Sequence, residues 1–201
     1  MSAGSPMDDI VMFIDVTFEM TACPGDNQRV MYNSYKKGHG YKWQGVTSPD
    51  RHLALCHGPV EGHHADGHIL DWSGLEELIR NVFHGYGGRQ LFVYGDPAYG
   101  EMDVIVSGLK KVQDLSPLKQ QFNTTMAQLQ QSVECSFGKL GNLWAFLNYK
   151  PGIQTHLSPV ACYFHVTVLL TNAHTSLYGL HISKYFGCKP PTVNEYFHKV
   201  Q

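Results

Sequence analysis

The sequence lacks several features that would assign it to a familiar class of protein. Its longest apolar stretches fall short of the ~18–20 residues that a membrane helix needs, which excludes a spanning segment. Residues 1–9 contain neither a basic region nor a long apolar run, so they do not resemble a signal peptide, and we expect a loose tail there. Charged residues make up only 16% of the chain and its net charge is −2, which excludes a strongly basic protein that wraps nucleic acid.

Cysteine is scarce and shows no pattern of pairs. An odd number without a C-x-x-C spacing fits reduced thiols of an intracellular protein better than a disulfide framework. Hydrophobic residues make up 43% of the 201 residues, so we expect a single domain over residues 1–201 with a hydrophobic core of its own. The five cysteines are Cys23, Cys56, Cys135, Cys162 and Cys188.

Two short apolar runs rich in strand-forming residues each lead to an aspartate. Residues 10–14 predict a buried strand that ends at Asp15. Residues 91–94 predict a second buried strand, and Pro97 stops its pairing, so Asp96 is expected at its carboxyl end. The sequence therefore predicts two buried strands with an acidic residue at the end of each.

The other patterns predict one hairpin and three helices. Turn residues between two strand-like segments favour an antiparallel hairpin, and apolar residues spaced by three and four favour amphipathic helices. This order of strands and helices is typical of an α/β domain with a mixed sheet covered by helices. The segments are the hairpin strands 41–47 and 53–57 and the helices 75–83, 117–140 and 159–179.

Three carboxylates are placed to form a site. Asp15 and Asp96 meet if their strands are neighbours, because sites in α/β sheets gather at the carboxyl ends of the strands. Glu134 follows Val133 of the long helix's buried stripe, and a rotation of ~100° per residue puts it on the rim of the packed face. Converging carboxylates need a divalent cation, and hard oxygen ligands suit Mg²⁺ or Mn²⁺. The alternative is that both aspartates cap turns and that Glu134 is a solvated helix residue.

A series of motifs in a fixed order covers nearly the whole chain. Three of them contain the acidic residues: Phe13-Ile14-Asp15, Tyr94-Gly95-Asp96-Pro97-Ala98-Tyr99 and Ser132-Val133-Glu134-Cys135-Ser136-Phe137-Gly138-Lys139. With these motifs the sequence resembles the catalytic domain of PIF/Harbinger-type DDE transposases, the DDE superfamily endonuclease group. The further matching segments are residues 30–33, 41–46, 58–62, 169–172 and 186–191.

The resemblance implies an RNase H-like fold and a DNA endonuclease or transposase. The family's metal-binding and catalytic triad falls on Asp15, Asp96 and Glu134. Two Mg²⁺ or Mn²⁺ ions about 4 Å apart would activate a water or a DNA 3′-hydroxyl for attack on a phosphodiester. The resemblance also implies DNA as a partner, a separate Myb/SANT-like protein that delivers the enzyme to DNA, and a location in the nucleus and cytoplasm.

The chain departs from the family pattern in several places. Val16 stands where the family has glycine, and Ala65 replaces the histidine of a pair that keeps Asp66. Lys139 is the basic residue that follows the Phe-Gly of the glutamate helix, but Gly141 replaces a further lysine. The family's N-terminal DNA-binding region is expected to be absent. These departures favour the alternative, a catalytically inactive transposon-derived protein that keeps the fold to bind DNA or protein.

Two polar clusters offer further binding hypotheses. Residues 32–42 concentrate lysines and tyrosines, which could contact phosphates and stack on bases, or could form a solvated strand edge. A histidine-rich loop invites a zinc site, although its spacing matches no zinc signature. Asp66 in that loop could instead reach the metal cleft as an auxiliary acid. The loop histidines are His57, His63, His64 and His68.

Overall fold

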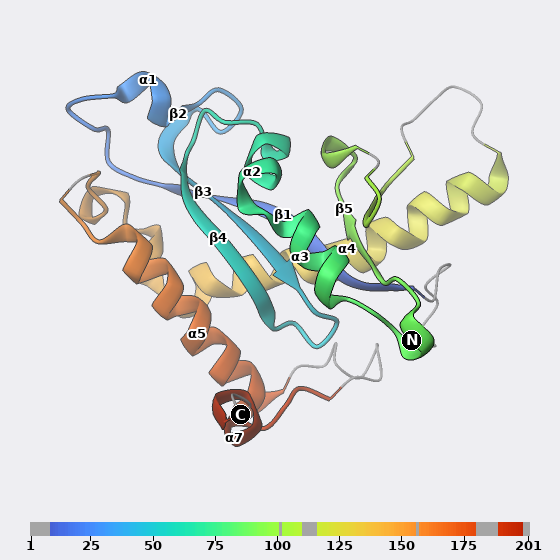
Figure 1. The fold of residues 1–201 in the computed structure, drawn as a ribbon. Helices are drawn as coiled ribbons and strands as arrows, with labels where there is room; N and C mark the ends of the chain where they lie inside the picture. The colour runs from blue at the N-terminus through green and yellow to red at the C-terminus, as the bar shows by residue number, and fades with distance from the viewer. Residues whose placement is uncertain (1–8, 101, 110–115, 156, 180–188, 199–201) are drawn as a thin grey trace.

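The structure, a computed structural model, describes residues 9–100, 102–109, 116–155, 157–179 and 189–198. Only the backbone is described at residues 86, 128–129 and 131–135. Helices flank a curled mixed sheet (Figure 1). This arrangement confirms the predicted α/β class and is compatible with an RNase H-like fold. None of the described helices is long and apolar enough to cross a membrane.

Strands dominate the first half of the chain and helices the second. The strands are β1 (Ile10–Met20), β2 (Tyr32–Asn33), β3 (Gly38–Thr47), β4 (Leu53–Glu61), β5 (Phe92–Gly95) and β6 (Ile105–Ser107). The α-helices are α1 (Gln28–Met31), α2 (Asp66–Ser73), α3 (Leu75–Val82), α4 (Pro117–Leu143), α5 (Val160–Tyr178) and α7 (Val193–His198). The short 3₁₀ turns are η1 (Tyr86–Gly88), η2 (Pro97–Tyr99), η3 (Ala145–Asn148) and η4 (Lys150–Gly152).

Strand β1 lies between two partner strands in the sheet. The strand order is β2-β3-β1-β5-β6, and β4 pairs with β3 as the predicted antiparallel hairpin. β1 is antiparallel to β3, with Ile14 opposite Val46, and parallel to β5, with Phe13 opposite Tyr94. The segment that contains α2 and α3 connects β4 of the hairpin to β5. It serves as the crossover that brings β5 back parallel to β1.

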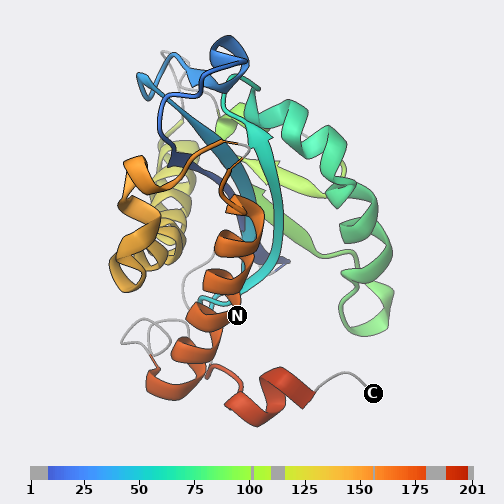
Figure 2. The same ribbon diagram turned by 90° about the vertical axis from the view of Figure 1, so that its left-hand side faces the viewer.

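Each face of the sheet packs against its own helices, with α2 and α3 on one side and α4 on the other (Figure 2). Successive side chains of a strand point to opposite faces. Ile14 accordingly packs in a buried cluster with Ile79 of α3, whereas Phe13 packs with Met126 of α4. On the α4 side Trp43 is fully buried and stacks on Phe164 of α5, with ring centroids 4.2 Å apart.

The structure corrects some of the predicted boundaries. β1 does not end at Asp15 but continues to Met20, because its second half goes on pairing with β3 as far as Gly40. β4 likewise runs through Gly58-Pro59, which the sequence favours as a loop. The helix α2 was not predicted, since only two of its residues, Ile69 and Leu70, are buried, too few to give a helical period.

Candidate active site

Asp15 and Asp96 lie on neighbouring strands, Asp15 in the middle of β1 and Asp96 directly after β5. The pairing of β1 with β5 ends at Phe13 and Tyr94, and each aspartate comes two residues further along its strand. The Oδ1 atom of Asp96, directly after β5, accepts a hydrogen bond from the Ala98 N–H at 3.0 Å. The Oδ1 atom of Asp15 accepts one from the Val16 N–H at 2.8 Å. The structure therefore brings together two of the three predicted site residues, although Asp15 lies within its strand.

Both aspartates line a cleft of about 710 Å³, which we call the carboxylate cleft. Its opposite wall is formed by α4, through residues that include Gly138 and Gly141. Glu134 precedes these two glycines by four and seven positions, so its backbone lies on the same stripe of the helix. The side chain of Glu134 lies outside the described part of the structure.

The position of α4 over the cleft depends on one close contact with β3. Gly45 is the register partner of Asp15, and a Cβ atom at residue 45 would clash with the ring of Phe137 on α4. The buried Phe137 ring therefore lies directly on the backbone beside Asp15. Glu134 comes three residues earlier, slightly less than one helical turn.

Glu19 is a cleft residue that the sequence analysis missed. Asp15, Thr17 and Glu19 alternate along β1, so they share one face of the sheet, and all three line the cleft. The Oε1 atom of Glu19 is buried and has no hydrogen-bond partner among the described residues. Burial raises the pKa of this carboxyl from 4.5 to about 7. The sequence contains this period-two pattern, but the pattern places Glu19 on the same face as Asp15 only if the strand continues past Asp15.

Negative charge gathers at this edge of the sheet. Burial raises the pKa of the Tyr99 phenol, and the carboxylates of Asp66, Asp15 and Asp96 raise it further. Asp96 is exposed and has no ion-pair partner among the described residues. The two aspartates thus offer hard oxygen ligands where negative charge accumulates, and this donor set fits Mg²⁺ or Mn²⁺.

Asp66 occupies a different place from the one that an auxiliary acid would need. Its Oδ1 atom forms an ion pair with Lys42 Nζ at 2.6 Å, and the same ammonium group donates a hydrogen bond to the His64 carbonyl at 2.7 Å. Asp66 is not among the described residues that line the cleft. The charge of Asp66 contributes to the raised pKa of Tyr99, but its carboxylate is already paired with the Lys42 ammonium group.

Two residues that bear on the family resemblance contact groups outside the carboxylate cleft, and one of them, Val16, also lines it. Lys139 donates a hydrogen bond to Thr175 Oγ1 at 2.8 Å and so ties α4 to α5. Burial lowers the pKa of Lys139, and the charge of Arg51 lowers it further. Val16 packs against the cluster on the α2 and α3 side of the sheet. This packing explains how a valine is accommodated beside Asp15.

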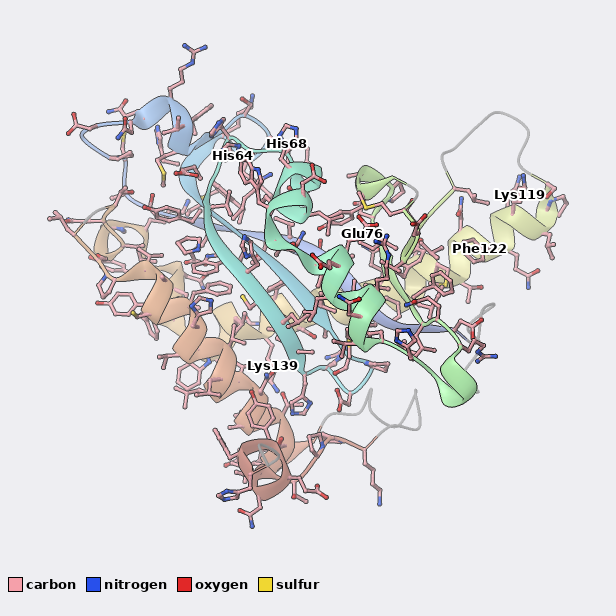
Figure 3. All side chains as sticks on the ribbon, viewed as in Figure 1. His64, His68, Glu76, Lys119, Phe122 and Lys139 are labelled. Atoms are coloured by element: carbon pink, nitrogen blue, oxygen red, sulfur yellow. The ribbon has the colours of Figure 1, made fainter. Side chains whose placement is uncertain are left out.

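The histidine loop does not form a zinc site in the part of the chain that the structure describes. His63 donates its Nδ1 hydrogen to the Val30 carbonyl at 2.8 Å, and the His63 and His64 ring centroids lie 3.8 Å apart. His64 and His68 lie near the start of α2, far from Lys139 in the view of Figure 3. Among the described residues, no three histidine, cysteine, aspartate or glutamate side chains are grouped so that they could hold a metal ion.

The cationic and aromatic segment forms the β2–β3 hairpin. Buried Asn33 fixes its turn, because its Nδ2 donates to the Gly62 carbonyl at 2.8 Å while its Oδ1 accepts from the N–H groups of Tyr35 and Lys36. Tyr35 is 87% exposed, and it lines the carboxylate cleft together with Lys36. The turn thus presents an aromatic ring and a cation to the same cleft as the two aspartates, from the Met20 end of β1.

Comparison with known proteins gives one match. A family model described as DDE superfamily endonuclease matches residues 14–172, a range that contains Asp15, Asp96 and Glu134. No curated protein and no solved structure matches the chain.

Proposed function

Because the chain belongs to the DDE superfamily endonucleases, we propose that it is a metal-dependent DNA endonuclease of the PIF/Harbinger transposase type. Asp15, Asp96 and Glu134 would hold Mg²⁺ or Mn²⁺. When bound, these ions supply Lewis-acid stabilisation of a phosphodiester and lower the pKa of a water or a 3′-hydroxyl. The observation that supports the proposal is that Asp15 and Asp96, on neighbouring strands, line one cleft whose opposite wall belongs to the helix that contains Glu134.

The residues of the chain orient the groups that react. The Ala98 N–H holds the Asp96 carboxylate in place, and a ligand with a fixed rotamer loses less entropy when it binds an ion. Lys36 is placed to contact a phosphate of the DNA, and Tyr35 to stack on an exposed base. The hairpin turn would thereby hold the strand whose phosphodiester lies over the aspartates.

The partners and the location of the protein follow from the same proposal. The substrate is DNA, a separate Myb/SANT-like protein delivers the enzyme to it, and the nucleus is the compartment in which it is cut, with a further pool in the cytoplasm. Co-purification of the chain with a Myb/SANT-like protein, and loss of nuclear localisation without that protein, would support this part of the proposal.

The test is nicking of supercoiled plasmid DNA by the purified chain with Mn²⁺ or Mg²⁺. We expect Asp96→Asn and Glu134→Gln to lower the rate by about 100-fold or more, since metal ligands support several kcal/mol of transition-state stabilisation. Asp103→Asn is the matched control, because Asp103 is 83% exposed and pairs with Arg80 outside the cleft. Equal cutting by the wild type, Asp96→Asn and Glu134→Gln would refute the assignment.

The same preparation separates the enzyme from its alternative, an inactive DNA-binding descendant. Titration calorimetry with Mn²⁺ measures whether the site binds the ion at all, independently of cutting. Heat of binding that disappears in Asp96→Asn supports the metal site. A folded chain that binds DNA but neither binds Mn²⁺ nor nicks the plasmid would favour the binding module.

A further inference from the structure

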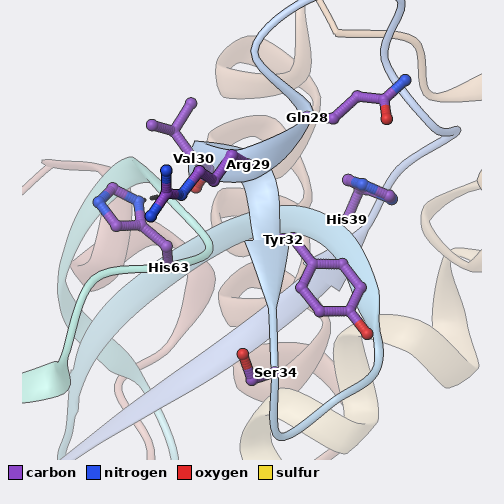
Figure 4. A pocket seen from close by; sticks show the side chains of 7 residues that line it. All are labelled: Gln28, Arg29, Val30, Tyr32, Ser34, His39 and His63. Atoms are coloured by element: carbon purple, nitrogen blue, oxygen red, sulfur yellow. Dashed lines mark hydrogen bonds between the residues drawn. The ribbon is translucent and has the colours of Figure 1, made fainter.

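The β2–β3 hairpin borders two cavities. Tyr35 and Lys36 line the carboxylate cleft, whereas Tyr32, Ser34 and His39 line a second cavity of about 650 Å³. We call this second cavity the hairpin pocket, and Figure 4 shows it from close by. The residues that line it are Gln28, Arg29, Val30, Tyr32, Ser34, His39 and His63.

The hairpin pocket is suited to an anion. None of its seven described lining residues is acidic, and the exposed Arg29 brings a permanent positive charge. The His63 ring is held by the hydrogen bond from its Nδ1 to the Val30 carbonyl, so its Nε2 is an acceptor in the neutral ring and donates to a phosphate only in the protonated ring. The hydroxyl of Ser34 adds a neutral donor, and the Gln28 amide, whose Nε2 already donates to the Pro24 carbonyl at 2.9 Å, has one further N–H. These groups match the oxygens of a phosphate.

The pocket also offers an aromatic surface. Tyr32 and His39 meet edge to face, with ring centroids 5.3 Å apart and an angle of 62° between the ring planes. In such a contact at least one ring keeps both faces clear of the other, and the Tyr32 residue is 37% exposed. A planar base can therefore stack here, as bases do on the aromatic side chains of single-strand binding proteins.

Phosphate donors and stacking rings in one cavity point to a nucleotide. We propose that the hairpin pocket binds one nucleotide of a single DNA strand, with Arg29 and His63 on its phosphate and Tyr32 and His39 on its base. This inference rests on the proposed function, because it identifies the ligand as the continuation of the strand held at the carboxylate cleft. The DNA strand would pass from one cavity to the other along the β2–β3 hairpin, because residues of this hairpin line both cavities.

The test measures binding without cutting. Fluorescence anisotropy follows a labelled single-stranded oligonucleotide as it binds the full-length chain in EDTA, at several salt concentrations. We expect Arg29→Gln to weaken binding about tenfold and to lower the slope of log affinity against log salt by about 0.7, the value for one phosphate contact on a single strand. Tyr32→Leu should weaken binding about fivefold or more and leave the salt slope unchanged, because it removes stacking and no charge.

Arg89→Gln is the matched control for charge. Arg89 pairs with Asp9 at 2.6 Å and does not line the hairpin pocket, so its loss should leave the affinity within about twofold of the wild type. Circular dichroism and urea unfolding show whether each variant is folded. Arg29→Gln and Tyr32→Leu chains that are folded and bind like the Arg89→Gln control would overturn the proposal, and so would a wild-type chain that does not bind the oligonucleotide.

The outcomes separate this inference from the proposed nuclease function. If Asp96→Asn abolishes nicking while Arg29→Gln and Tyr32→Leu bind normally, the nuclease is supported and the pocket is refuted. If the wild type does not nick DNA but Arg29→Gln weakens binding with the lower salt slope, the pocket is supported and the nuclease is refuted.

Discussion

Replacing Gly45 by alanine tests whether Phe137 holds α4 over the carboxylate cleft. The new Cβ atom would clash with the Phe137 ring. It would also lie 2.9 Å from Leu53 Cδ2, which is shorter than the ordinary contact distance of 3.4–4 Å. Both side chains belong to one buried cluster, so neither can move without displacing its neighbours. Overpacking of this kind costs about 1–3 kcal/mol, and we expect the free energy of unfolding to fall by that amount.

Urea unfolding of a set of variants measures this cost. Phe137→Leu replaces the ring that causes the clash by a shorter side chain. The double variant Gly45→Ala/Phe137→Leu should therefore be about 1 kcal/mol more stable than the sum of the two single effects predicts. Gly138→Ala is the control on the same helix, because a Cβ atom there meets nothing within 4 Å. It should raise the stability by about 0.5–1 kcal/mol, the usual gain from replacing glycine inside a helix.

The reasoning fails if Gly45→Ala unfolds at the same urea concentration as the wild type, or if the two single effects simply add. A second readout links the contact to the site. Under the proposed function, a displaced α4 moves Glu134 away from Asp15, so Gly45→Ala should nick plasmid DNA more slowly than the wild type does.

Two further predictions concern polar groups near the cleft. Because burial raises the pKa of Glu19 from 4.5 to about 7, the stability it contributes is complete below pH 4.5 and is lost as the pH rises through about 7. Glu19→Gln should remove this loss of unfolding free energy, which is about 1–2 kcal/mol after allowance for the partial exposure of Glu19. Urea unfolding across that pH range measures the loss, and a pH profile of Glu19→Gln identical to that of the wild type would contradict the prediction. Asn33→Ala should cost about 1–3 kcal/mol because it leaves the Gly62 carbonyl without its buried donor. Ser34→Ala, at an exposed position, should change the unfolding free energy by less than about 0.5 kcal/mol, and an equal loss in both variants would refute the role of Asn33.

The elements with strong hydrophobic periods could be predicted from the sequence. The long helix begins at Pro117 as its capping residues indicate, and the hairpin forms around residues 48–50. Local patterns failed where pairing with another strand decides the outcome. The alternation of residues 15–20 is compatible with a strand, but only the pairing with β3 shows that the strand continues, and the prediction therefore ended β1 too early.

The candidate site likewise contains residues that the sequence could predict and residues that it could not. The sequence predicted that Asp15 and Asp96 come together only if their strands are neighbours, and the structure pairs these strands and places both aspartates in one cleft. Glu19 could not be assigned without the correct length of β1. The hairpin pocket was beyond prediction from local patterns, because His63 and Val30 are brought together only by hydrogen bonds between distant segments.

The central place of β1 gives the two walls of the cleft different mechanical properties. β1 pairs with β5 as far as Phe13 and with β3 from Phe13 to Met20, so Asp15 can shift only if backbone hydrogen bonds of the sheet deform. The opposite wall is a helix that meets the sheet through side chains alone, and sliding of packed helices costs far less than breaking a ladder of backbone bonds. Under the proposed function, we therefore expect adjustment to a bound DNA strand to come from α4 rather than from β1.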